Sequence, residues 1–157
     1  MDKTLLLRQD FEQLYQALKD EGYQVVGPTE KQGAIQFEHI NNFEQLPWGR
    51  QEQVEPGSYQ LKQAQENRCF QWNTGPQSFK PYLFSPTQML WTGDETDDGL
   101  VFKQVEPTAT PLAFIGVRSC DIAALYLQDK HFMHSQYPDV WYTQQREQMF
   151  IVAVNCS

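Results

Sequence analysis

Residues 111–130 constrain the possible folds of this chain more than any other stretch, because two hydrophobic patterns meet in them. Leu112 to Val117 form a continuous apolar run with the length of a buried strand. From Ile122 to Asp129 the apolar residues recur at helical spacing and leave a polar outer face. The sequence therefore predicts a buried strand that leads almost directly into a helix.

The residues between these two patterns suit a site for chemistry. Ser119 is a good N-cap residue and Asp121 suits the first turn of the predicted helix over 120–130. Free backbone N–H groups and the helix dipole favour negative charge at such a position, and they lower the pKa of a thiol placed there. We therefore predict Arg118 and Ser119 as cofactor-binding residues, with Cys120 as the reactive or ligating thiol.

A second cysteine follows the strongest β pattern of the chain. Residues 149–155 are almost wholly apolar, which predicts a strand covered on both faces, and Cys156 comes directly after it. With the strand over 112–117 and the helix, this segment forms a predicted βαβ unit. Because the carboxyl ends of parallel strands meet at one sheet edge, we expect Cys120 and Cys156 to lie close together if their strands are neighbours.

Three interpretations of this pair remain open. Both cysteines can be small buried residues, which is common for cysteine. Cys120 can be a catalytic nucleophile, but it then needs a general base, and His131 and His134 lie at the far end of the predicted helix. The third interpretation is iron–sulfur ligation, which takes about four cysteines for a cubane cluster, so Cys120 and Cys156 would need further ligands from elsewhere.

The remaining patterns predict one mixed α/β domain over residues 1–157. It combines an N-terminal helix (4–21), a hairpin with a long loop (strands 23–26 and 34–40), further strands and a second helix (140–148) with the C-terminal parallel βαβ unit. Other strands are expected at 58–62, 67–72 and 100–105. We expect 41–57 to be irregular, 79–84 to be extended, 85–91 to hold a short helix and 93–99 to be an acidic loop.

Composition excludes several classes of protein. The net charge of −8 argues against a general nucleic-acid or anionic-membrane surface. No apolar run approaches the roughly 20 residues that span a bilayer. Three cysteines without a CxxC pair argue against a disulfide scaffold and predict a cytoplasmic location. Cys69 is expected to be buried, and the His131/His134 pair without a third ligand is a weak metal motif.

One segment is similar to a known family. Gly116-Val-Arg-Ser-Cys-Asp-Ile-Ala-Ala-Leu125 resembles the Gly-Val-Arg-Pro-Cys-Asp segment of 4Fe-4S dicluster ferredoxin-type subunits, namely sulfhydrogenase beta subunits and anaerobic sulfite reductase A subunits. Residues 26–28, 56–61, 78–80 with 83–86, and 154–156 fit the same family in the same order. Ser119 stands where the family commonly has proline, and both residues suit a helix start.

The resemblance implies an electron-transfer role. The chain is expected to be the N-terminal fragment of a longer hydrogenase- or sulfite reductase-type subunit, which continues into a Cys-rich stretch and a ferredoxin-like part with two [4Fe-4S] clusters. Its partners would be a flavin-binding reductase-like subunit and a catalytic subunit. By the same resemblance, Cys120 and Cys156 match cysteines expected to help hold an additional cluster. The alternatives are a thiol-dependent enzyme that uses Cys120, or an anion-binding module at Arg118.

Overall fold

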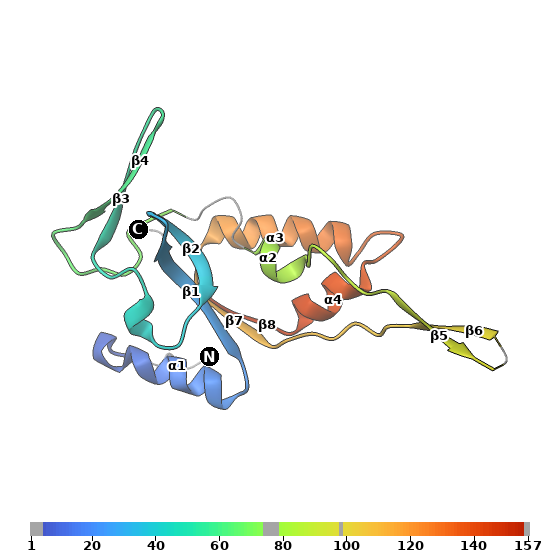
Figure 1. The fold of residues 1–157 in the computed structure, drawn as a ribbon. Helices are drawn as coiled ribbons and strands as arrows, with labels where there is room; N and C mark the ends of the chain where they lie inside the picture. Colours follow the sequence, from blue (N-terminus) through green and yellow to red (C-terminus); the bar gives the residue numbers. More distant parts are fainter. Residues whose placement is uncertain (1–4, 74–78, 98, 156–157) are drawn as a thin grey trace.

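The fold is built on a four-stranded mixed sheet. A computed structural model describes residues 5–73, 79–97 and 99–155. The sheet has the order β2-β1-β7-β8, formed by β1 (Gln24–Lys31), β2 (Ala34–His39), β7 (Leu112–Val117) and β8 (Met149–Ala153). β1 pairs antiparallel with β2, whereas β7 pairs parallel with both β1 and β8 (Figure 1). The predicted α/β class, with a parallel C-terminal βαβ unit, is confirmed.

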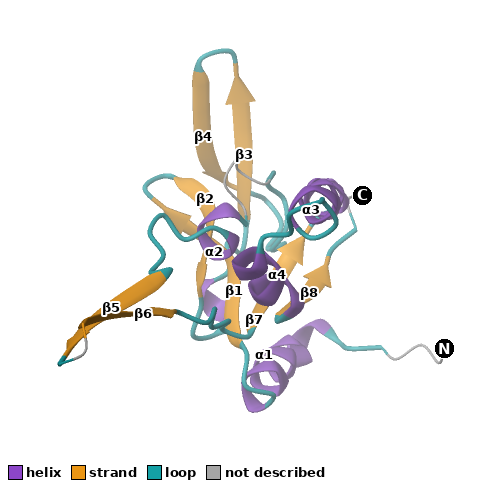
Figure 2. Ribbon diagram, turned by 90° about the vertical axis from the view of Figure 1, so that its right-hand side faces the viewer, coloured by secondary structure: helices purple, strands orange, loops and turns teal. Residues whose placement is uncertain are grey.

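Helices cover both faces of this sheet (Figures 1 and 2). α1 (Phe11–Asp20), which follows the short 3-10 turn η1 (Arg8–Asp10), packs on one face. α3 (Ser119–Phe132), α4 (Val140–Glu147) and the single turn α2 (Lys80–Leu83) lie on the other. The predicted helices over 120–130 and 140–148 are thus present, and the N-terminal helix is shorter than expected.

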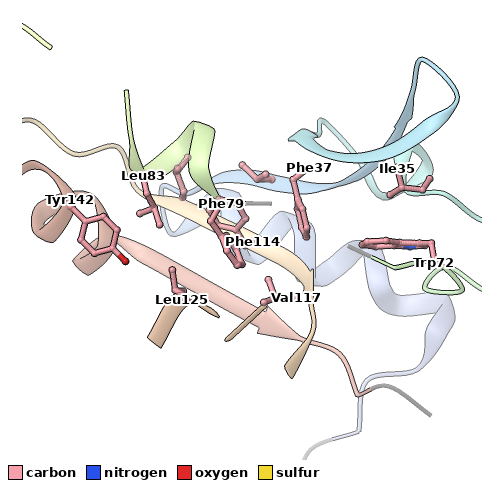
Figure 3. Packing of buried hydrophobic residues seen from close by; sticks show 11 residues of the cluster. Ile35, Phe37, Trp72, Phe79, Leu83, Phe114, Val117, Leu125 and Tyr142 are labelled. Atoms are coloured by element: carbon pink, nitrogen blue, oxygen red, sulfur yellow. The ribbon is translucent and has the colours of Figure 1, made fainter. Parts of the chain in front are cut away.

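β7 lies between the two halves of the core because all of its side chains are apolar and all are buried. Successive side chains of a strand point to opposite faces. Phe114 accordingly packs with the first cluster, which includes Phe37 and Leu125 (Figure 3). Ala113 and Ile115 pack with the second cluster, beneath α1. The continuous apolar run therefore reflects a strand that is covered on both faces, and the predicted buried strand is confirmed.

Two hairpins extend away from the body of the fold (Figures 1 and 2). One consists of β3 (Arg50–Glu55) and β4 (Ser58–Gln63), and the other of β5 (Trp91–Thr96) and β6 (Gly99–Gln104). The predictions of irregular structure over 41–57 and of an acidic loop over 93–99 are therefore wrong in part. Hairpin pairing supplies the backbone hydrogen bonds of β3 and β5, which are mostly polar and have no buried residue that a sequence pattern would reveal.

Several other local predictions are wrong. Residues 67–72 form no strand, and their contact with the hairpin is the isolated bridge between Gln51 and Gln71. Residues 80–83 form α2 instead of an extended segment, because Pro81 occupies the helix start, where its missing N–H costs nothing. No helix forms over the expected range 85–91, and Trp91 begins β5.

The first hairpin of the sheet is also tighter than expected. β1 continues through Gly27 and Pro28, and it pairs with β7 only as far as Val26, so the missing N–H of Pro28 leaves that pairing intact. The turn to β2 contains only Gln32 and Gly33, both at positive φ (53° and 76°), which is typical of a type I′ turn.

β8 is an edge strand whose residues are all half-buried or exposed, which corrects the prediction that it is covered on both faces. Only β7 pairs with it, and Phe150 is 44% exposed. An apolar run predicts a strand, but it does not by itself show how much of the two faces of that strand the rest of the chain covers.

Candidate functional site

The candidate site lies where β7 passes into α3. The Arg118 N–H donates to the Asp121 carboxylate at 3.0 Å, which makes Arg118 the N-cap and Ser119 the first helical residue. The prediction of Ser119 as N-cap is therefore wrong by one residue, while Asp121 lies in the first turn as expected. An acidic side chain at the third helical position bonds back to the N-cap N–H in this way in capping boxes.

Gly116 marks a bulge just before this junction. The pairing between β7 and β8 shifts register between Ile115 and Val117, and Gly116 has φ +85°. A Cβ at this position would lie 2.7 Å from Cε1 of the Phe70 ring. Glycine is thus required both by the left-handed backbone and by the aromatic ring against it. The sequence signal for this feature was a lone glycine inside an apolar strand, which often marks a bulge.

The Arg118 side chain reaches across to the segment that contains Phe70 and Trp72. Its Nη2 donates to the Phe70 carbonyl at 2.9 Å and also to the Trp72 carbonyl. The guanidinium lies 5.2 Å from the centre of the Trp72 ring. Arg118 therefore holds this segment against the strand–helix junction, and its cofactor-binding role, like that of the exposed Ser119, stays a prediction.

Cys120 is a free, exposed thiol in the first turn of α3. The histidines are not placed to act as its base. His131 lies in the last turn of the same helix, eleven residues or about 16 Å along its axis, and His134 follows that helix. His39 lies in β2, which is separated from β7 by β1. The geometry gives the nucleophile interpretation no partner histidine.

Cys69 has a different environment. Its side chain is 5% exposed and packs in the core cluster beneath α1. Burial raises the pKa of Cys69 to about 12, and the nearby positive charge of Arg8 acts weakly in the opposite direction. A thiol that stays protonated at neutral pH is neither a good nucleophile nor a ready metal ligand. The predicted burial of Cys69 is confirmed.

The end of the described chain returns to the junction. β8 is the direct parallel neighbour of β7, and the Val154 N–H donates to the Val117 carbonyl at 2.8 Å. Asn155 lines the same pocket as Arg118. Cys156 lies outside the described residues, so its predicted approach to Cys120 stays a prediction.

These residues do not by themselves make a cluster site. Over residues 5–73, 79–97 and 99–155, no three side chains of His, Cys, Asp or Glu lie together as a metal-binding group. Cys120 is the one exposed cysteine in that part of the chain. Any cluster at this edge would need most of its ligands from elsewhere. Across the same ranges, no helix is both long and apolar enough to cross a bilayer.

An open pocket of about 730 Å³ borders the junction, and we call it the arginine pocket. Arg8, Arg68 and Arg118 line it together with the aromatic side chains of Trp48 and Trp72. These residues come from four separate segments of the chain, and sequence patterns gave no sign that they meet. The pocket lies at the carboxyl ends of β7 and β8, where ligands commonly bind in open α/β sheets.

Comparison with known proteins adds no family assignment: no protein-family model matches the chain, and neither a curated protein nor a solved structure shows a significant match to it.

Proposed function

We propose that this chain is the N-terminal domain of an iron–sulfur electron-transfer subunit of a cytoplasmic oxidoreductase, of the hydrogenase or sulfite reductase type. Its role would be to dock a flavin-binding reductase-like subunit and a catalytic subunit, and to contribute to one cluster site. The domain itself would be non-catalytic. The [4Fe-4S] clusters would supply one-electron transfer in the complete subunit.

The placement of Cys120 is the observation that carries this proposal. Its thiol is exposed at the start of α3, beside the end of the buried strand β7. β8, whose sequence runs on into Cys156, is the parallel neighbour of β7. An exposed thiol at a helix N-terminus, close to backbone N–H groups, suits a thiolate ligand. The alternative of a nucleophilic enzyme has less support because no histidine lies beside Cys120.

The test is anaerobic reconstitution of the complete gene product with iron and sulfide, in the wild type and in two alanine variants. Cys120→Ala should lower the iron content per chain and alter the EPR spectrum of the reduced protein. Cys69→Ala removes one buried thiol elsewhere and serves as the matched control, with iron content and spectrum unchanged. If Cys120→Ala keeps the wild-type iron content and the wild-type spectrum, Cys120 is not a cluster ligand and the proposal loses its main support.

A further inference from the structure

The arginine pocket concentrates positive charge in an acidic protein. The chain carries five arginines and a net charge of −8, yet three of those arginines line this one pocket. Glu52 is the single acidic side chain among the described lining residues. Its two carboxylate oxygens accept hydrogen bonds from the Tyr59 hydroxyl and the Asn73 N–H, and its single negative charge leaves the described lining side chains with a net positive charge. The local field in the pocket therefore favours an anion.

Aromatic rings hold two of the three guanidinium groups in place. Arg8 lies 5.0 Å from the ring centre of Trp48 and donates to the Asn67 carbonyl. Arg118 lies over Trp72 in the same way. Stacked guanidinium groups keep further N–H donors available at their edges, and they match the geometry of phosphate and carboxylate oxygens.

Arg8 and Arg68 are the arginines best placed to meet a ligand. In the described part of the chain, no carboxylate forms an ion pair with Arg8. Arg68 pairs with Glu66, but its side chain is 62% exposed, so this pair is weakly held and easily exchanged. Two cations that line the pocket thus remain available to an anionic group.

Gln71 offers this pocket a hydrogen-bond acceptor in place of a positive charge. Its Oε1 atom is buried, and it receives no hydrogen bond from the residues that the structure describes. A buried carbonyl oxygen without a donor costs free energy. Because the terminal torsion of glutamine is soft, the Gln71 amide can turn toward the pocket, and a ligand that then donates an N–H group to Oε1 would be favoured. The pocket therefore combines an anion-binding side with an acceptor that suits a nitrogen-bearing ring.

We propose that the arginine pocket binds a phosphorylated nitrogen heterocycle, a ligand of nucleoside monophosphate type. The phosphate would meet Arg8 and Arg68, and an N–H group of the ring would donate to Gln71 Oε1. A volume of about 730 Å³ lies within the usual range for pockets that hold small ligands. This inference does not depend on the iron–sulfur proposal, because Cys120 is not among the residues that line the pocket.

The experiment is isothermal titration calorimetry of the complete protein with AMP, adenosine, ribose 5-phosphate and inorganic phosphate as separate probes. AMP should bind more tightly than each of the other three. Arg8→Gln and Arg68→Gln should each raise the Kd for AMP about tenfold, because each removes a charge-assisted hydrogen bond. Arg50→Gln is the matched control, since Arg50 pairs with Glu30 outside the pocket, and its Kd should equal that of the wild type.

Gln71→Leu tests the contact between the nitrogen heterocycle and Gln71 Oε1. This variant should raise the Kd for AMP and leave the Kd for ribose 5-phosphate unchanged, which reduces the preference for AMP. The proposal is overturned if AMP shows no saturable binding up to millimolar concentration, or if Arg8→Gln and Arg50→Gln bind it alike. Equal affinity for AMP and inorganic phosphate would also overturn it, because the pocket would then hold an anion only. Cys120→Ala should leave AMP binding unchanged, which separates this test from that of the cluster site.

Discussion

Replacement of Gly116 by alanine tests the geometry of the candidate site most directly. The backbone at Gly116 has φ +85°, and a left-handed conformation costs an alanine roughly 1–2 kcal/mol. The new Cβ would also lie 2.7 Å from Phe70 Cε1 and 3.2 Å from Cδ1, so the ring must shift in a packed environment. Overpacking of this kind costs about 1–3 kcal/mol. We therefore expect Gly116→Ala to lower the free energy of unfolding by about 3 kcal/mol.

Urea denaturation followed by circular dichroism measures this loss, and a double-mutant cycle separates its two causes. With an m-value of about 2 kcal/mol/M, a loss of 3 kcal/mol lowers the midpoint by about 1.5 M. In a Phe70→Ala background the ring is gone, so Gly116→Ala should cost only its backbone share, giving a coupling of about 1–2 kcal/mol. Equal costs in the two backgrounds would refute the close contact between Gly116 and Phe70.

Three further predictions follow from burial and exposure. Iodoacetamide at pH 8 should label the exposed Cys120 in the folded protein. It should label Cys69 only after unfolding, because Cys69 is buried and this burial raises its pKa to about 12. Similar labelling rates for the two cysteines in peptide mapping would contradict this. Burial also raises the pKa of Tyr82 from 10.0 to about 12, so the free energy of unfolding should fall as pH rises from 10 to 12, because the unfolded chain then loses this proton first. Tyr82→Phe should make the free energy of unfolding fall less steeply between pH 10 and 12. An unchanged slope would contradict the assignment of this pH dependence to Tyr82. Amides of β5 and β6 should exchange with solvent far faster than those of β7, since every described side chain of these two strands is exposed. Protection close to that of β7 would show that this hairpin is held by more than its own pairing.

The local pattern around residues 112–132 was sufficient to predict the centre of the fold. The six consecutive apolar residues predicted a buried strand, and β7 has that place. Asp121 three residues after Arg118 sets the start of α3, because its carboxylate bonds back to the N-cap N–H. The helical crossover from β7 to β8 predicted that the two strands run parallel, but it left open whether they are direct neighbours. These features depend on neighbours in the chain, which a sequence pattern records.

Other features were decided by contacts between distant segments. β3 and β5 are polar strands whose pairing partners, not their own side chains, make them strands. β8 has the apolar sequence of a covered strand, yet it lies at the edge of the sheet and its residues are all half-buried or exposed. Arg118 bonds to carbonyls that lie 48 and 46 residues earlier in the chain. The arginine pocket brings Arg8, Arg68 and Arg118 together in the same way.

The physical reason for this division is the range of the interactions. Hydrophobic periodicity and helix capping act between residues that are close in the chain. The sequence alone therefore determined the buried strand β7, the helix α3 after it, and the place of Cys120 in the first turn of that helix. Strand order, the number of neighbours of an edge strand and the meeting of charged side chains depend on how the whole chain packs. The tertiary structure alone therefore decided that the cysteine-bearing junction borders a cationic pocket.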